Sequence, residues 1–233
     1  MLTIGHKGAG GYVAENTLES IQKALDLKVD GIEIDVFRCA SGEIVVFHDK
    51  KLKRLTGHNG WIEETNFEEL SNILVEGKYR IPSLEEVIEI INGKILLNIE
   101  LKGKNTAVPT ATILKKYIKE TQSDTKQFIV SSLDWTELKL FKNLNTGIPV
   151  GILSDYNILL KKGVNNIIKK GRDLNAVAMH PKLSILNKKA IDKMHSAGFL
   201  VYSWTINSPK DIQKAIKLGV DGIITDFPDR VPD

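Results

Sequence analysis

Short apolar runs alternate with longer amphipathic stretches along this chain, and this alternation restricts the possible folds more than any other feature. The run at 31–37, GIEIDVF, carries β-branched and aromatic residues typical of strands. The stretch at 16–27 instead places Leu18, Ile21, Ala24 and Leu25 at a helical period. Regular alternation of strands and helices favours parallel strands that are joined by crossover helices.

Eight strand positions are predicted if residues 31–47 count as one position, and eight such units close into a (β/α)₈ TIM barrel. A doubly wound open sheet is the alternative, but no GxGxxG motif follows a predicted strand. The predicted strands are 2–5, 31–37 with 44–47, 95–101, 128–131, 149–153, 176–179, 200–204 and 222–225, and the predicted helices are 16–27, 83–91, 110–120, 135–144, 158–170, 188–195 and 209–217.

The domain organisation follows from length and from one break in the alternation. The chain has 233 residues, which fits a single barrel domain spanning 1–233. Residues 49–80 interrupt the pattern and predict a small insertion at the rim where the strands end. An internal echo supports closure, since LKVDGIEIDV at 27–36 resembles LGVDGIITDF at 218–227, with an aspartate at the same point of each.

Composition limits the location and the partners. The net charge is only +3 and lysine pairs such as Lys161-Lys162 are widely separated, which indicates solvated helix faces rather than a nucleic-acid surface. The single cysteine, Cys39, excludes an intramolecular disulfide and fits a reducing compartment. There is no secretion-signal pattern and no apolar run long enough to cross a membrane, so we expect a cytoplasmic protein without an integral membrane segment. The oligomeric state is not readable from the sequence.

Two acids interrupt the apolar run at 31–37. Glu33 and Asp35 are two residues apart and therefore share one face of a strand. Taken alone, such a pair fits a solvated or salt-bridged strand end as well as it fits a functional site. However, NIELK at 98–102 repeats the pattern with Glu100 and Lys102. Three carboxylates at one barrel mouth predict a site for one divalent cation, Ca²⁺ or Mg²⁺, in preference to zinc.

Two histidines end other apolar runs, His6 in LTIGH and His48 in IVVFH. A single histidine at a strand end is more often structural than catalytic. Two at the same rim, beside three acids, indicate a pair that exchanges protons near neutral pH. Lys7 and Lys102 add positive charge. A cation, two lysines and two histidines around one cavity are what phosphate chemistry requires.

These residues, in this order, resemble the glycerophosphodiester phosphodiesterase family. The motifs that carry the resemblance are His6-Lys7-Gly8, Glu15-Asn16-Thr17, Glu33-x-Asp35, His48-Asp49, Glu100-x-Lys102 and the closing GVDGIITDFP at 219–228. One departure is Lys7, where the family usually has arginine. Lysine keeps the charge but lacks the planar fork that holds a phosphate through two hydrogen bonds.

The resemblance implies a metal-dependent hydrolase on a TIM barrel. Its substrates would be glycerophosphodiesters such as glycerophosphocholine or glycerophosphoethanolamine, and its products sn-glycerol 3-phosphate and an alcohol, in lipid and glycerol metabolism. Glu33, Asp35 and Glu100 would hold the cation, and His6 and His48 would form the acid–base pair. The neighbouring glycerol hydroxyl would attack phosphorus first, giving a cyclic phosphate that water opens. The sequence does not decide which histidine is the first base; we favour His6 as base and His48 as acid.

Further residues have competing interpretations. Trp204, in SWTIN, would line the glycerol side of the site or pack in the core. Glu15 would contact Lys7 or the water shell of the metal, in a stretch that could also cap a helix. The predicted substrate-binding residues are therefore Lys7, Glu15, Lys102 and Trp204. Asp49 would orient His48 or the loop.

Three rival functions remain open from the sequence. A phospholipase D-like barrel acting on lipid headgroups would use the same metal and histidines. A metal-dependent lyase or isomerase would use Lys102 as base, but it would leave His6 and His48 without a shared task. A barrel used only for binding would be expected to have lost members of the acid set or of the histidine pair.

Overall fold

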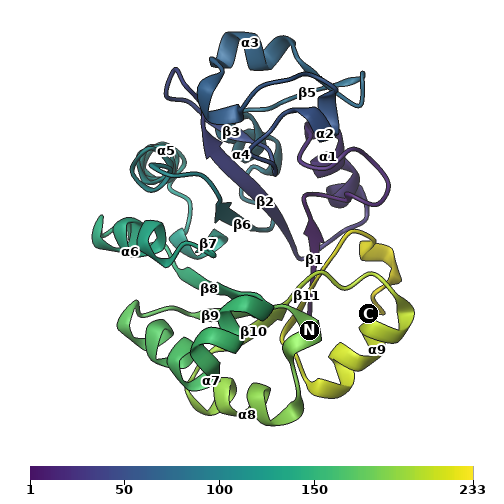
Figure 1. Ribbon diagram of the computed structural model, residues 1–233, viewed down its shortest axis with the longest axis vertical. Coiled ribbons are helices and arrows are strands. Elements are labelled where there is room, and N and C mark those ends of the chain that lie inside the picture. Colours follow the sequence, from purple (N-terminus) through teal and green to yellow (C-terminus); the bar gives the residue numbers. More distant parts are fainter. Residues whose placement is uncertain (233) are drawn as a thin grey trace.

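The computed structural model describes residues 1–232, with the side chain of Leu160 excepted, and within this range eight parallel strands close into a barrel (Figure 1). Strand β1 pairs with both β2 and β11, which closes the ring. The predicted TIM barrel is therefore confirmed. In order around the barrel the strands are β1 (Leu2–His6), β2 (Gly31–Arg38), β6 (Leu96–Leu101), β7 (Phe128–Ser132), β8 (Val150–Ser154), β9 (Ala178–Pro181), β10 (Leu200–Ser203) and β11 (Gly222–Thr225).

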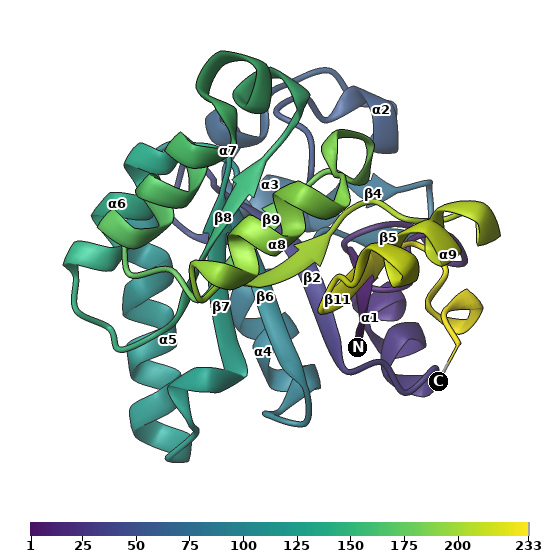
Figure 2. The ribbon, with the colours of Figure 1, turned by 90° about the horizontal axis from the view of Figure 1, so that it is seen from below.

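Helices cover the outside of the barrel; in Figure 2, α8 lies in front of the strands, with α9 to the right and α5 and α6 to the left. Local sequence sets where they begin: Thr17 caps α1, and Ser83 and Glu86 form the predicted capping box of α4. Within residues 1–232, no helix combines the length and the apolar character needed to cross a membrane. The helices are α1 (Leu18–Asp26), α4 (Leu84–Ile91), α5 (Ala107–Thr121), α6 (Trp135–Asn143), α7 (Tyr156–Asp173), α8 (Lys188–Ser196) and α9 (Pro209–Leu218), with short 3₁₀ turns η2 (Thr125–Gln127), η3 (Leu183–Ile185) and η4 (Pro228–Arg230).

The segment between β3 (Ile44–Val46) and α4 forms small elements of its own, at the top of Figure 1. Strand β3 runs antiparallel to β2, so these two strands make the hairpin on which the segment packs. Phe37 and Phe47 of the hairpin region join Leu52, Ile62 and Leu70 in a buried apolar cluster. The elements are α2 (Lys53–Thr56), η1 (Ile62–Glu64), α3 (Phe67–Asn72), β4 (Leu74–Val75) and β5 (Tyr79–Arg80).

One predicted strand boundary is wrong in a way that matters for the site. The chain leaves α7 and turns through Asn175, which has a φ of 47°, so β9 begins only at Ala178 and ends at Pro181. The predicted strand stopped at Met179 and left His180 outside. In the structure His180 pairs in register with Leu153 of β8 and belongs to the barrel wall.

Apolar side chains fill the barrel lumen beneath the site. Ile4, Ile129, Ala178, Tyr202 and Ile224 come from five different strands and are all buried in one cluster. A filled lumen is typical of this barrel, whose chemistry takes place at the C-terminal ends of the strands. The polar residues at these strand ends therefore define the candidate site.

Candidate active site

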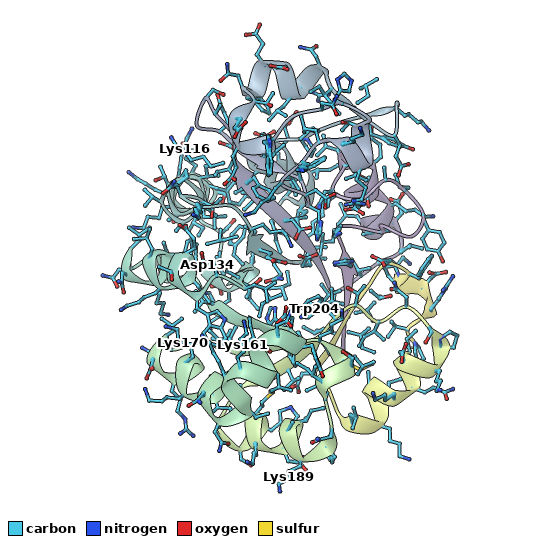
Figure 3. The ribbon with its side chains drawn as sticks, viewed as in Figure 1. Lys116, Asp134, Lys161, Lys170, Lys189 and Trp204 are labelled. Carbon is cyan, nitrogen blue, oxygen red and sulfur yellow. The ribbon has the colours of Figure 1, made fainter. Side chains whose placement is uncertain are left out.

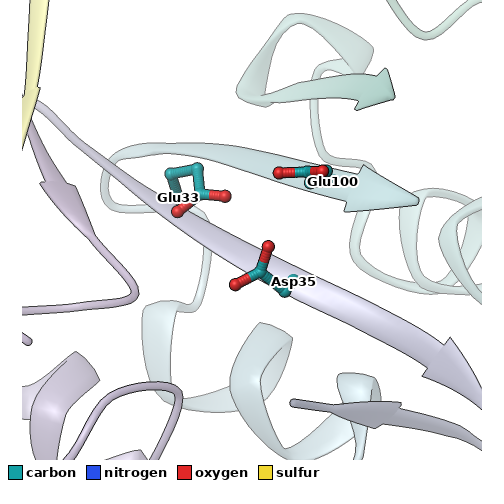
Figure 4. Close-up of side chains that lie close together, drawn as sticks. All are labelled: Glu33, Asp35 and Glu100. Atoms are coloured by element: carbon teal, nitrogen blue, oxygen red, sulfur yellow. The ribbon is translucent and has the colours of Figure 1, made fainter. Parts of the chain in front are cut away.

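Three carboxylates from two adjacent strands converge at the mouth of the barrel (Figure 4). Glu33 and Asp35 lie on β2, and Asp35 is in register with Glu100 on β6. One oxygen of each lies within 4.8 Å of the others, and the three side chains are buried. The structure thus brings together the three acids that the sequence predicted as metal ligands.

The electrostatics of this triad are those of a cation site. Burial, together with the neighbouring acids, raises the pKa of Glu33 well above its usual range and that of Glu100 to about 7. Burial also opposes ionisation of Asp35, but Lys102 and the two histidines hold its pKa below the usual value. Adjacent buried carboxylates repel each other unless a cation lies between them, and oxygen-only donors suit Ca²⁺ or Mg²⁺. The residues present therefore fit a hard divalent ion.

His48 is held between an acid and a lysine. Its Nδ1 lies 2.6 Å from Oδ1 of Asp49, and its Nε2 lies 3.3 Å from Nζ of Lys102. Burial and the nearby ammonium groups lower the pKa of His48. Because an ammonium group can only donate, Nε2 accepts from Lys102 and the ring is neutral, with its proton on Nδ1. The same lysine contacts Glu100 at 3.2 Å and Asp35 at 3.5 Å.

His6, at the end of β1, has a matching arrangement. Its Nδ1 lies 2.6 Å from Oδ1 of Asp226, and its Nε2 lies 3.8 Å from Oε2 of Glu33. Asn207 in turn donates to the other oxygen of Asp226. Burial acts to raise the pKa of the Asp226 carboxyl, but the hydrogen bond with His6 outweighs it and the pKa is lowered, so Asp226 stays ionised. Each histidine therefore has a carboxylate that fixes its tautomer and orientation.

A cavity of about 130 Å³ connects these groups. Trp204, near the middle of the molecule in Figure 3, lies on its wall, whereas the labelled lysines lie on the surrounding helices. Seven residues predicted for the site line the cavity: His6, Glu33, Asp35, His48, Glu100, Lys102 and Trp204. The other lining residues are Asn98, Leu133, Leu153, His180, Thr205 and Ile224.

Two predicted substrate-binding residues, Lys7 and Glu15, are not among the described residues that line this cavity. Nζ of Lys7 instead lies 3.0 Å from Oε1 of Glu15, which also accepts from Arg54. Arg54 contacts Asp49, the partner of His48. The structure therefore places both residues in an ion-pair network that ends at His48 and orients it from behind. The predicted contact between Glu15 and Lys7 is present.

Several residues of the site were not assigned from the sequence. Asp226 orients His6, Arg54 contacts the partner of His48, and Asn16 donates to Asp35 at 3.0 Å. A signal for Asp226 was present, because the internal echo aligns it with Asp35 at the end of an equivalent strand. Arg54 lies within the insertion, where no periodicity gives a position for its side chain.

A (β/α)₈ barrel with a buried acid triad and two carboxylate-paired histidines at its mouth is the architecture of a barrel enzyme whose acids fit a divalent cation. Residues 6–230 match the glycerophosphoryl diester phosphodiesterase family. The chain belongs to this family, as the sequence motifs predicted.

Individual relatives agree with this assignment. A glycerophosphodiester phosphodiesterase of Caldanaerobacter subterraneus is 31% identical over 98% of this chain and 95% of its own length. One from Bacillus altitudinis is 32% identical over 97% of this chain and 94% of its own length. The solved structure of an Oleispira antarctica phosphodiesterase, in complex with the product sn-glycerol-3-phosphate, superimposes with a TM-score of 0.87 at 26% identity, covering 99% of this chain and 95% of that one.

Proposed function

We propose that this protein hydrolyses glycerophosphodiesters, such as glycerophosphocholine or glycerophosphoethanolamine, to sn-glycerol 3-phosphate and an alcohol. The observation that carries the proposal is the convergence of the acid triad, Lys102, His6 and His48 on one cavity. The product complex of the Oleispira relative supports the substrate class.

Glu33, Asp35 and Glu100 would hold one divalent cation, Ca²⁺ or Mg²⁺. When bound, the cation neutralises phosphate charge and polarises a phosphoryl oxygen. The three acids come from adjacent strands of a rigid barrel, so little ordering is needed to bring the donors together. Asn16 donates to Asp35, which fixes the orientation of that carboxylate.

Lys102 would bind the phosphate. Its ammonium group lies at the centre of the site, within 3.5 Å of Asp35, Glu100 and His48 atoms. A phosphodiester carries one negative charge, which has to be balanced while the attacking oxygen approaches. Lys102 would supply part of this balance directly, whereas Lys7 lies behind Glu15 and would act through the field of the site.

The two histidines would form the acid–base pair. A tethered glycerol hydroxyl has a high effective concentration, so no nucleophilic side chain is needed for the first step. One ring takes the proton of this hydroxyl, the other gives a proton to the leaving alkoxide, and the roles exchange when water opens the cyclic phosphate. Since Nε2 of His48 accepts from Lys102, we propose His48 as the first base and His6 as the acid. This order is the reverse of the one favoured from the sequence.

A phospholipase D-like activity is the second candidate. A human lysophospholipase D is 26% identical over 99% of this chain and 84% of its own length. The same metal ligands and histidines would serve this reaction, so only the substrate would differ. We further propose a cytoplasmic location, which is supported by the free, buried thiol of Cys39.

The experiment is turnover by the purified protein after exhaustive chelation, with Ca²⁺ or Mg²⁺ then added back. Glycerophosphocholine, glycerophosphoethanolamine and lysophosphatidylcholine are compared, and release of glycerol 3-phosphate or of free choline is followed. We expect turnover of the first two substrates only in the presence of added metal. Release of choline from the lysolipid alone would instead establish the second candidate. No release from any of the three would overturn the proposal.

A further inference from the structure

The cavity has two unlike walls. One wall, from β1, β2, β6 and the loop after β3, carries the acids, Lys102 and the catalytic histidines. The opposite wall, which follows β7 to β10, carries Leu133, Leu153, His180, Trp204 and Thr205. We call the first the charged wall and the second the neutral wall. The proposed chemistry uses the charged wall and assigns no polar group on the neutral wall.

His180 stands out on the neutral wall. Its residue is only 1% exposed, yet neither ring nitrogen has a hydrogen-bond partner among the described residues. Leaving a buried polar group unpaired is destabilising, and such groups in native structures need an explanation. The ring faces the cavity, where Asn98 also has an unpaired side-chain oxygen. Both observations indicate that a polar ligand completes this part of the cavity.

The surrounding strands hold the His180 ring in place. A Cβ atom at Gly151 would lie 2.5 Å from Nε2 of His180, so glycine at this position makes room for the ring. The Tyr202 ring lies 5.4 Å from it on the other strand. The indole nitrogen of Trp204 donates to the carbonyl oxygen of His180 at 2.7 Å. The imidazole is therefore pre-positioned, which lowers the entropic cost of binding a ligand.

The protonation state of the ring indicates what it binds. Burial lowers the pKa of His180 to about 3, so the ring is neutral at physiological pH. A neutral imidazole has one donor and one acceptor nitrogen. An alcohol hydroxyl also donates once and accepts, which matches the ring, whereas a phosphate dianion can only accept. The chemistry favours a hydroxyl group over the phosphate as the partner of His180.

We propose that His180 binds a hydroxyl group of the glycerol moiety and so selects glycerol phosphates over plain alkyl phosphates. The inference rests on the proposed function, and it adds a specificity-determining residue on the wall opposite the metal ligands. In this arrangement the charged wall takes the phosphate and the neutral wall takes the glycerol. His180 then positions the hydroxyl-bearing carbon chain beside the proton-transferring histidines.

The test compares two ligands with the same charge and the same carbon count. Calorimetry in the presence of the activating metal gives the affinities for sn-glycerol 3-phosphate and for n-propyl phosphate. We expect the wild-type protein to favour glycerol 3-phosphate by ~10-fold or more, since a hydrogen bond to a buried group contributes about 1.4 kcal/mol or more. In His180→Phe this preference should vanish, with the affinity for propyl phosphate changed by less than ~3-fold.

Three further variants and one spectroscopic measurement separate binding from folding. Gly151→Ala leaves the imidazole present but displaces it, and it should reduce the same preference. His180→Gln keeps a donor and an acceptor and should retain part of it. His195→Phe, the same substitution at a histidine on α8 outside the cavity, should leave both affinities unchanged. In the unmodified protein, the ¹⁵N signals of the His180 ring should shift with glycerol 3-phosphate and not with inorganic phosphate.

The outcomes distinguish this inference from the proposed function. An unchanged preference in folded His180→Phe overturns the role of His180, and so does a wild-type protein that binds both ligands equally. If His180→Phe does not fold, Gly151→Ala and the ¹⁵N signals decide in its place. A wild-type protein that turns over no glycerophosphodiester overturns the proposed function, whatever the variants show.

Discussion

The charged and neutral walls of the cavity differ in how their polar groups are satisfied. On the charged wall each histidine has a carboxylate, and Lys102 contacts three acceptors. On the neutral wall His180 has no partner within the described part of the chain. Charged groups that are paired in this way are held in place, whereas the unpaired ring of His180, and the unpaired side-chain oxygen of Asn98 on β6, are free to bind a ligand. Under the two proposals above, the charged wall would carry the catalytic residues and the neutral wall would recognise the substrate.

The largest effect is expected when a proposed metal ligand is removed from the charged wall. In Glu100→Gln a neutral amide replaces the acid in register with Asp35. Because the cation supplies several kcal/mol of charge stabilisation, we expect kcat/KM to fall by ~10³-fold. A metal titration followed by activity checks this and should shift to higher concentration. Glu89→Gln, at an exposed acid on α4, is the control; full activity of Glu100→Gln would remove Glu100 from the metal site.

The second largest effect is expected when the imidazole ring of His6 or of His48 is removed. We expect His6→Ala and His48→Ala each to lower kcat by ~10²-fold or more, the usual scale for a positioned proton transfer. The measurement is steady-state turnover of glycerophosphocholine at saturating substrate. His58→Ala, at an exposed histidine in the insertion, should behave as the wild-type protein. A near-normal rate in either of the first two variants would exclude that ring from the mechanism.

Most of the charged wall was predictable from sequence. Alternation along a strand puts Glu33 and Asp35 on one face, and the barrel brings their strand beside that of Glu100, so pattern and fold class together were sufficient. The histidines followed because they end apolar runs. Each residue of this wall lies within, or directly after, a short run whose apolar character is clear from the sequence alone.

The neutral wall was not predictable in the same way, apart from Trp204. His180 lies in AVAMHP, where the apolar run begins at Ala176, before the strand starts at Ala178, so periodicity cannot give the register. Its significance depends on Gly151 and Tyr202, on neighbouring strands that are far apart in sequence. Lys7 shows part of the same limit. The sequence offered its contact with Glu15 as one of two alternatives for that acid, but only the fold shows that neither residue is among those that line the cavity.

The stability of the protein in acid tests whether the His180 ring on the neutral wall is unpaired in the folded protein. His180 has a pKa of about 3 when folded, against an ordinary value of 6.5. The unfolded chain therefore binds this proton below pH 6.5 and the folded protein does not until pH 3, so stability is lost as the pH falls through this window. Between pH 7 and pH 5 we expect a loss of roughly 2 kcal/mol from this group.

Chemical denaturation at both pH values, in wild type and in His180→Phe, isolates this contribution. The acids of the charged wall titrate in both proteins, so the difference between the two proteins reports His180 alone. We expect the wild type to lose more stability than the variant on acidification. An equal loss would show that the ring is protonated, and so hydrated or paired, in the folded protein.

The smallest expected effect is at Lys7, which lies behind the charged wall rather than in it. Its backbone has a φ of 54°, its side chain is buried, and its ammonium group contacts Glu15. Lys7→Arg keeps the charge and can pair with Glu15 through two hydrogen bonds, so we expect kcat/KM within ~3-fold of wild type. Lys7→Met, which removes the charge and leaves Glu15 to Arg54, should lower activity more. If Lys7→Arg abolished turnover, the site would depend on the shorter lysine, and Lys7 would belong to the charged wall itself.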